Sequence, residues 1–442
     1  MRARQPRHPG RVNAQKRSLG AVDAALLTVG AIVGTGIFIT SGDIAEQLPH
    51  PGLILLVYLA SGLLILAGAL TYAELGVLFP RAGGIYHYLK EAYGPLWGFL
   101  FGWTAFLVIM SGGIAAIATG FGQFLAVFVP GLPPAASAVA AIVLLTAVNH
   151  VGLRPGAGVQ NLLTVLKIGA ILALVGLSAA RPAPQQPDLI APLPPGFGLS
   201  AFGLAMIAAL WSYDGWYGVT CAAGEIRNPK RDLPIGLIAG TLIVMLLYGL
   251  LNWMYVASLS MDQMAATDRV AETAAVAAFG PAAGRWVAAV VVVSAFGCLA
   301  ATILYSSRIY PPMAADGVFF QRVARLHPRW QTPVWSLWMQ SGWAIVLALS
   351  GTYQQLYTYV TFASVMFYAA AAGSVFVLRR KRPELPRPYR TWGYPVVPAL
   401  FLLACVALLA NTLLQSVREA LVGLGLVLLG LPAYAYWKRK PA

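Results

Sequence analysis

Charged residues are scarce in this sequence of 442 residues, where Asp, Glu, Lys and Arg together make up only 10%. Soluble domains carry about 25% charged residues, so the chain does not have the composition of an ordinary soluble protein. Hydrophobic residues reach 59%, and the mean hydropathy is +0.71. The composition therefore predicts an all-α membrane protein that forms one membrane-embedded unit.

Cysteine and histidine are also few. Cys221, Cys298 and Cys405 lie in or beside apolar segments without CxxC spacing, and the five histidines are scattered without ligand spacing. We therefore expect neither a disulfide nor a metal site, and no cofactor. An embedded enzyme would need a catalytic constellation such as paired acids or a histidine-rich cluster, and the sequence contains neither, so we do not expect an enzyme. The first 19 residues are basic and polar and lack a secretory signal.

Twelve apolar segments are each long enough to cross a hydrocarbon core of roughly 30 Å. The predicted spans are 20–40, 52–79, 95–129, 135–152, 157–179, 199–222, 233–259, 284–309, 333–351, 355–379, 395–415 and 419–437.

The net charge of +15 raises the question of nucleic-acid binding, but the positive charges lie in short gaps between apolar segments. Most Lys and Arg residues fall in the N-terminal tail 1–19, the even-numbered gaps and the C-terminal tail 438–442. The other side has only Arg181, Arg269, Arg285 and Arg418. This asymmetry predicts an inner-membrane protein with both termini in the cytoplasm, and no nucleic-acid partner.

The first span contains glycines at 30, 34 and 36. Gly30 and Gly34 form a GxxxG pair, which is typical of close helix packing. The alternative is a helix broken inside the bilayer, which exposes backbone N–H and C=O groups to a polar substrate beside a cavity. The first span alone leaves both interpretations open.

The sixth span favours the broken helix. Its apolar stretch is interrupted at residues 211–217 by the polar and aromatic sequence WSYDGWY. Interruptions in spans one and six, five helices apart, are typical of an inverted five-helix repeat. Helix N-termini then offer N–H groups to a carboxylate, and helix C-termini offer carbonyls to an ammonium group, as a zwitterionic amino acid requires.

Four stretches resemble the amino acid–polyamine–organocation (APC) superfamily, and within it the L-amino-acid-transporter-like branch with bacterial exchangers. They are GAIVGTGIF (30–38), YAELGVLFPRAGGIYHYLKEAYG (72–94), SYDGWYGVTCAAGEIRNPKRDLP (212–234) and SSRIYPPMAADGVFF (306–320). The resemblance implies a LeuT-like fold, with inverted repeats at 20–179 and 199–379 and two extra helices at 395–437.

The resemblance also implies a substrate site at the two interruptions. The amides of Thr35 and Gly36 would hold the substrate carboxylate. Carbonyls near Ile32 and Val33, and others around Trp211 and Asp214, would hold the α-amine, with Trp211 as an aromatic gate. The expected binding residues are Ile32, Val33, Gly34, Thr35, Gly36, Trp211, Ser212, Tyr213, Asp214 and Gly215.

Lys167 lies inside the fifth span, where a charged side chain is costly and a functional role is the first hypothesis. The alternative is that it extends to the cytoplasmic interface. The resemblance implies that its ammonium group replaces the cation that sodium-coupled relatives bind, with Ser294 as a neighbour. That role predicts sodium-independent transport.

Asp214 has several readings. It could cap the half-helix, titrate as a proton coupler or bind a cationic side chain. We expect an exchanger or uniporter of neutral amino acids, working by alternating access with membrane lipid around it. The alternative is a proton-coupled permease for cationic amino acids or polyamines.

Eukaryotic members of this branch pair with a glycoprotein through an external cysteine between spans three and four. The corresponding gap, 130–136, contains no cysteine. No disulfide-linked glycoprotein partner is therefore expected.

Overall fold

The structure, a computed structural model, describes residue 17 and residues 19–151, 154–194, 197–351, 353–415 and 417–439. In this part of the chain the only strand-like pairing is a single bridge between Leu19 and Ile226, so the fold is all-helical. Most of the predicted tail 1–19, and residues 440–442 of the predicted tail 438–442, lie outside the described residues.

The first half of the chain forms a broken helix followed by four long helical segments. Its helices are α1 (Ala21–Ile32), α2 (Gly36–Gln47), α3 (Pro51–Leu78), α4 (Ile85–Tyr93), α5 (Pro95–Thr104), the π-helical segment η1 (Ala105–Ile109), α6 (Met110–Leu125), α7 (Pro134–Val151) and α8 (Arg154–Ala179).

The second half begins with another broken helix. Its helices are α9 (Leu199–Tyr213), α10 (Gly218–Cys221), η2 (Ala223–Glu225), α11 (Pro229–Ser258), α12 (Met261–Ala265), α13 (Val270–Phe279), α14 (Pro281–Ser306), α15 (Tyr310–Ala315), η3 (Gln321–Ala324), α16 (Val334–Ser350), α17 (Tyr353–Lys381), α18 (Val396–Gln415), α19 (Val417–Leu428) and α20 (Gly430–Arg439).

Among the described residues, nine helical segments are long and apolar enough to cross a membrane, and the bent pair α1–α2 would make a tenth. The other two predicted spans, the sixth and the ninth, correspond to α9 followed by α10 and to α16, which are shorter apolar helices. The multi-pass membrane architecture is confirmed. The count of twelve stays a prediction.

The helix bounds differ from the predicted spans in a few places. The first span continues to Gln47 rather than ending at 40, because the chain restarts as α2 after the break. The short helices α4, α12, α13 and α15 were not predicted. They contain only 5 to 10 residues each, so none has a hydrophobic run of membrane-spanning length.

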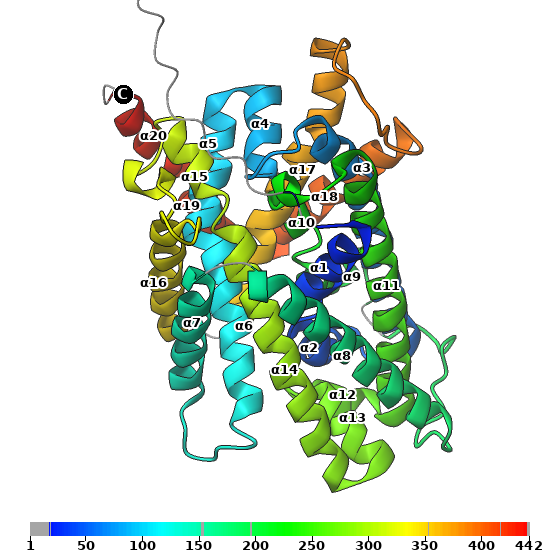
Figure 1. Cartoon of the computed structure of the whole chain (residues 1–442). Coiled ribbons are helices and arrows are strands. Elements are labelled where there is room, and N and C mark those ends of the chain that lie inside the picture. The colour runs from blue at the N-terminus through cyan, green and yellow to red at the C-terminus, as the bar shows by residue number, and fades with distance from the viewer. Residues whose placement is uncertain are drawn as a thin grey trace, which may run out of the picture.

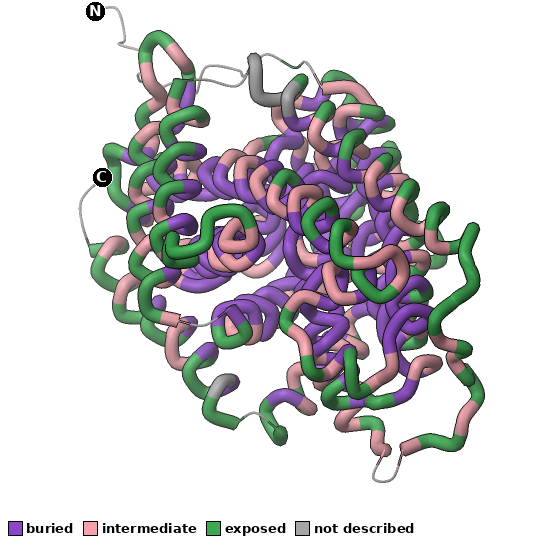
Figure 2. The backbone as a smooth tube through the Cα atoms, turned by 90° about the horizontal axis from the view of Figure 1, so that it is seen from below, coloured by how far each residue is buried: buried purple, intermediate pink, exposed green. Residues whose placement is uncertain are grey.

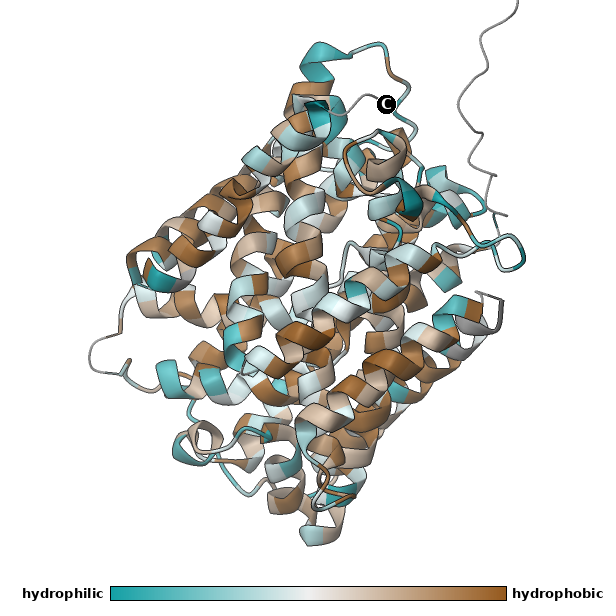
Figure 3. Cartoon of the chain, turned by 90° about the vertical axis from the view of Figure 1, so that its left-hand side faces the viewer, coloured by the Kyte–Doolittle hydropathy of each residue, from teal (hydrophilic) through white to brown (hydrophobic). Residues whose placement is uncertain are grey.

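The helices pack around a buried centre. The window of the third span, Pro95–Leu125, is 78% buried, whereas that of Gln160–Ala179 is 17% buried, so the third span is central and the fifth peripheral. Figure 1 shows α4, α15 and α20 toward one end of the molecule and α12 and α13 at the opposite end. Buried residues concentrate in the middle of the cross-section in Figure 2, and hydrophobic residues dominate the long helices in Figure 3.

Candidate functional site

The first helix is broken between Ile32 and Gly36, and α1 and α2 meet at an angle of 45°. Gly34 lies against α14, since a Cβ there would stand 2.9 Å from Cys298 Sγ. At Gly36, a Cβ would stand 2.7 Å from the Cα of Ser212. Only glycine therefore lets the start of α2 touch the end of α9.

The same region shows why two interpretations of the glycines were open. A Cβ at Gly30 would stand 2.4 Å from Gln160 Nε2 on α8, so this glycine serves close helix packing. Gly34 and Gly36, in contrast, lie at the break itself. Close helix packing at Gly30 and a broken helix at Gly34 and Gly36 are therefore both present.

The sixth span is broken after Tyr213. Gly215 has a φ of +92°, which favours glycine, and a Cβ there would stand 2.6 Å from the carbonyl oxygen of Ala31. The second break thus packs directly against the last turn of α1. The two interruptions, about 180 residues apart in the chain, form one site.

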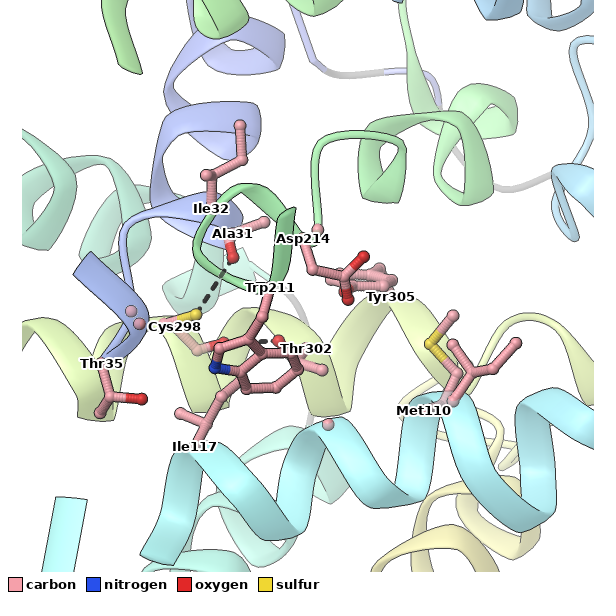
Figure 4. Close-up of a pocket in the computed structure, with 15 residues that line it drawn as sticks. Ala31, Ile32, Thr35, Met110, Ile117, Trp211, Asp214, Cys298, Thr302 and Tyr305 are labelled. Carbon is pink, nitrogen blue, oxygen red and sulfur yellow. Dashed lines mark hydrogen bonds between the residues drawn. The ribbon is translucent and has the colours of Figure 1, made fainter. Parts of the chain in front are cut away.

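A narrow cavity with a volume of about 30 Å³ opens at this junction. Figure 4 shows it between α6, α14 and the two breaks, with the Trp211 indole directed toward Ile117 of α6. The cavity is lined by Ala31, Ile32, Gly34, Thr35, Gly36, Ile109, Met110, Gly113, Ile117, Trp211, Asp214, Gly215, Cys298, Thr302 and Tyr305.

Side chains from neighbouring helices hold the carbonyls at the end of α1. Cys298 of α14 donates to Ala31 O at 3.1 Å (Figure 4), and Tyr248 of α11 lies 3.3 Å from Ile32 O. At the start of α2 the opposite holds. Within the described chain, no hydrogen bond uses the N–H groups of Thr35 and Gly36, which are therefore available to an anion.

Lys167 of α8 reaches the first break rather than a membrane interface. Its ammonium group donates to the carbonyls of Gly30, Val33 and Ser294 at 3.3, 2.8 and 3.2 Å, and its residue is only 2% exposed. The Ser294 hydroxyl also donates to Val33 O, at 3.0 Å. The ammonium group thus links α8 to α1 and α14 through carbonyl oxygens, the ligand type that binds alkali cations.

Tyr248 of α11 connects the two breaks and was not anticipated. Its hydroxyl lies 2.8 Å from Ser212 O and 3.3 Å from Ile32 O, one carbonyl at each break. Next to it, Thr40 shares hydrogen bonds with Ser212 Oγ at 2.7 Å and Tyr58 OH at 3.0 Å. This buried network fixes the relative position of α2, α9 and α11.

Asp214 lies at the start of the second break and lines the cavity beside Tyr305 (Figure 4). One of its carboxylate oxygens accepts a hydrogen bond from the Tyr368 hydroxyl of α17. No ion pair of Asp214 with Lys, Arg or His exists among the described residues. Its carboxylate therefore faces the cavity without a cationic partner.

Aromatic side chains close one side of the cavity. The Trp211 indole donates to Tyr353 OH at 2.8 Å and stacks on Tyr357, with ring centroids 6.1 Å apart and an interplanar angle of 20°. Tyr357 donates to Asp43 at 2.7 Å. Both tyrosines belong to α17, so this helix and α9 together form an aromatic layer over the cavity.

The predicted binding residues divide into two groups. Seven of the ten line the cavity, and Val33, Ser212 and Tyr213 do not. The Val33 carbonyl is occupied by Lys167 and Ser294 rather than facing the cavity, and the Tyr213 hydroxyl donates to Tyr58 O at 3.2 Å. These three residues therefore support the backbone at the breaks and do not line the cavity.

Sequence reasoning missed several members of the site. Cys298 was not among the expected site residues, although it lines the cavity and donates a hydrogen bond to α1. Tyr353 and Tyr357 were also missed. Their i, i+4 spacing places both on one helix face and was the available signal.

Two acids outside the cavity form ion pairs with arginines that are distant in sequence. Glu74 of α3 forms hydrogen bonds with Arg379 of α17, at 2.9 and 2.6 Å. Glu225 of η2 pairs with Arg308, which follows α14, at 2.6 Å. Both pairs therefore join segments that lie far apart in sequence.

Known proteins resemble this chain along nearly its whole length. Residues 19–428 match the family model described as amino acid permease. The serine/threonine exchanger SteT of Bacillus subtilis (strain 168) is 29% identical, over 97% of this chain and 99% of that protein. The large neutral amino acids transporter small subunit 2 of Homo sapiens is 30% identical, over 97% and 82%. The b(0,+)-type amino acid transporter 1 of Homo sapiens is 30% identical, over 97% and 89%.

Proposed function

Since the chain belongs to the amino acid permease family of the APC superfamily, we propose that it exchanges neutral amino acids across the cell membrane without sodium. The relatives named above are amino acid exchangers and transporters by name. The proposal adds to family membership the class of substrate, the absence of sodium coupling and the residues that bind.

The meeting of the two broken helices carries this proposal. The free N–H groups of Thr35 and Gly36 suit the α-carboxylate of a substrate. The carbonyls around Trp211 and Asp214 suit its α-ammonium group. The Ile32 carbonyl, expected to share this role, already accepts hydrogen bonds from Gly34 N at 2.8 Å and from the Tyr248 hydroxyl at 3.3 Å. A zwitterion needs both kinds of group within a few ångströms, and neither needs a charged side chain.

Lys167 supports sodium independence. Its ammonium group already lies among three carbonyls at the first break, at 2.8 to 3.3 Å. A sodium ion at the same place would meet a positive charge at contact distance. The protein therefore supplies a cation of its own at this position.

The alternative function is a proton-coupled permease for cationic amino acids or polyamines. Asp214 favours it, because this carboxylate faces the cavity without a cationic partner in the described chain. A cationic side chain of a substrate would supply that partner.

Uptake of labelled L-serine and L-arginine by preloaded proteoliposomes separates the two functions. We expect wild type to accumulate L-serine and not L-arginine, and Asp214→Asn to keep at least about half of the L-serine uptake, because L-serine has no cationic side chain for this carboxylate to pair with and backbone carbonyls bind its α-ammonium group. The exposed Asp188→Asn is the matched control. L-arginine uptake that Asp214→Asn abolishes, with Lys167 variants still active, would instead establish the cationic permease.

The remaining features of the proposal concern topology. The end of the molecule that carries α4 and α15 is called the basic end, because most Lys and Arg residues lie in its loops. We place this end in the cytoplasm. We also propose that 20–179 and 199–379 are inverted repeats, on the grounds that each begins with a broken helix. The chain is proposed to work without a disulfide-linked glycoprotein, since the gap 130–136 has no cysteine.

A further inference from the structure

A second and larger cavity lies beyond the aromatic layer. It has about 280 Å³ of free space, against about 30 Å³ in the central cavity. It is bounded by the ends of α2, α17 and α18 and by the middle of α9. A volume of this order is close to that of the smallest ligand pockets.

The position of this outer cavity relative to the central one follows from α9. Leu204, Ile207 and Ala208 line the outer cavity, and Trp211 lines the central one. These residues follow the i, i+3, i+4, i+7 spacing of a single helix face. The outer cavity therefore lies one to two turns toward the N-terminus of α9 from the central site.

Two stacked rings connect the linings of the two cavities, since Trp211 lines the central one. Tyr357 lines the outer cavity, and its ring lies parallel to that of Trp211 at a centroid distance of 6.1 Å. Hydrogen bonds to Tyr353 and Asp43, and edge contacts of both rings with the ring of Tyr353, hold the pair in place.

The lining of the outer cavity indicates its ligand. Six of its nine residues are polar and none carries a charge: the three glutamines Gln47, Gln354 and Gln355, and the hydroxyl-bearing Tyr357, Thr358 and Thr412. A carboxamide offers two donors and an acceptor, so glutamines can bind both the carboxylate and the ammonium group of a zwitterion. An isolated ion would lack a counter-charge here, and an acyl chain could form no hydrogen bond with the amides.

We infer that the outer cavity is a second binding site for small neutral amino acids. A substrate binds there first, and movement of Trp211 and Tyr357 then admits it to the central site. The inference rests on the proposed function, since it assumes that the chain transports amino acids. It adds a separate site with its own residues.

Counting the bound molecules tests the inference. Binding of labelled L-serine to the protein in lipid nanodiscs is measured to saturation, and uptake by proteoliposomes is measured from the same preparation. We expect two L-serine molecules per chain in wild type. Ala208→Phe fills the outer cavity and Gln354→Leu removes an amide from an exposed position, so each should bind one.

Gln415→Leu is the matched control, because Gln415 is an exposed glutamine of α18 that does not line the cavity; it should bind two. One L-serine per wild-type chain with uptake intact, as a lipid-filled cavity would give, overturns the outer site and leaves the proposed function standing. No binding and no uptake of neutral amino acids would overturn both.

Discussion

Charged groups behave differently in the two parts of this molecule where they are buried. At the basic end, Glu74 accepts two hydrogen bonds from Arg379 and two from Thr391, and Arg387 lies 3.6 Å away. At the helix breaks, Lys167 and Asp214 form no ion pair within the described residues, and their partners are carbonyls and a tyrosine hydroxyl.

This difference indicates two uses of charge. A carboxylate bound by two arginines is already satisfied, so it holds α3, α17 and the linker 382–395 in one arrangement. A lone ammonium or carboxylate at a cavity can instead interact with a ligand or stand in for one. The charged groups at the basic end therefore stabilise one conformation, and those at the helix breaks take part in binding.

The largest expected effect is at Lys167. Lys167→Met should reduce L-serine uptake at least about a hundredfold, because three carbonyls lose charge-assisted hydrogen bonds of about 1.5–3 kcal/mol each. Initial uptake rates in proteoliposomes measure it, and the exposed Lys230→Met should keep wild-type rates. A Lys167→Met variant with wild-type uptake would mean that the charge at the helix breaks is not needed for transport, which would contradict the difference drawn between the two regions.

Glu74→Gln should break the cluster at the basic end. Leaving Arg379 and Arg387 without their carboxylate should destabilise the protein by about 3 kcal/mol, as loss of one partner from a buried ion pair does. Thermal unfolding in detergent detects this as a lower Tm, with the exposed Glu384→Gln as the control. An unchanged Tm, with uptake abolished, would assign Glu74 to transport rather than to the conformation.

Tyr248→Phe should have a moderate effect on binding. It removes the hydroxyl near the carbonyls of Ile32 and Ser212, and a neutral hydrogen bond contributes about 0.5–1.5 kcal/mol, which corresponds to a rise in KM of about two- to tenfold. Uptake kinetics would show the rise with little change in maximal rate. A large fall in maximal rate at constant KM would place Tyr248 in the conformational change instead.

The smallest effect is expected at His87 in α4. Burial, and then the nearby Arg81, lower the pKa of His87 to about 4, whereas an unfolded histidine has a pKa of about 6.5. Stability from this group is therefore complete above pH 6.5 and is lost as the pH falls toward 4. Wild type should lose on the order of 1 kcal/mol more than His87→Gln between pH 7 and pH 5. Equal losses of Tm in the two proteins would contradict this.

Local sequence signals predicted the main features of the centre. The glycines of 30–36 and the polar interruption at 211–217 indicated two breaks, and the cost of a charge in an apolar span singled out Lys167. Each of these features depends on neighbours in the chain, so one sequence was enough to find it.

Features that depend on tertiary contacts were not predictable in the same way. Glu74 and Arg379 are 305 positions apart in the chain, so no local pattern pairs them. Tyr248 is one of 19 tyrosines, and nothing local shows that it faces a break. Helix packing decides such contacts, and a single sequence does not specify it.

The central claim is sodium-independent exchange at the two helix breaks. Its most direct test is uptake of labelled L-serine by proteoliposomes that are either empty or preloaded with unlabelled L-serine, each with and without sodium. The account predicts uptake that requires internal substrate and is the same in both salts. Sodium-dependent uptake into empty vesicles would contradict it, because the Lys167 ammonium group could not then occupy the place of the coupling ion.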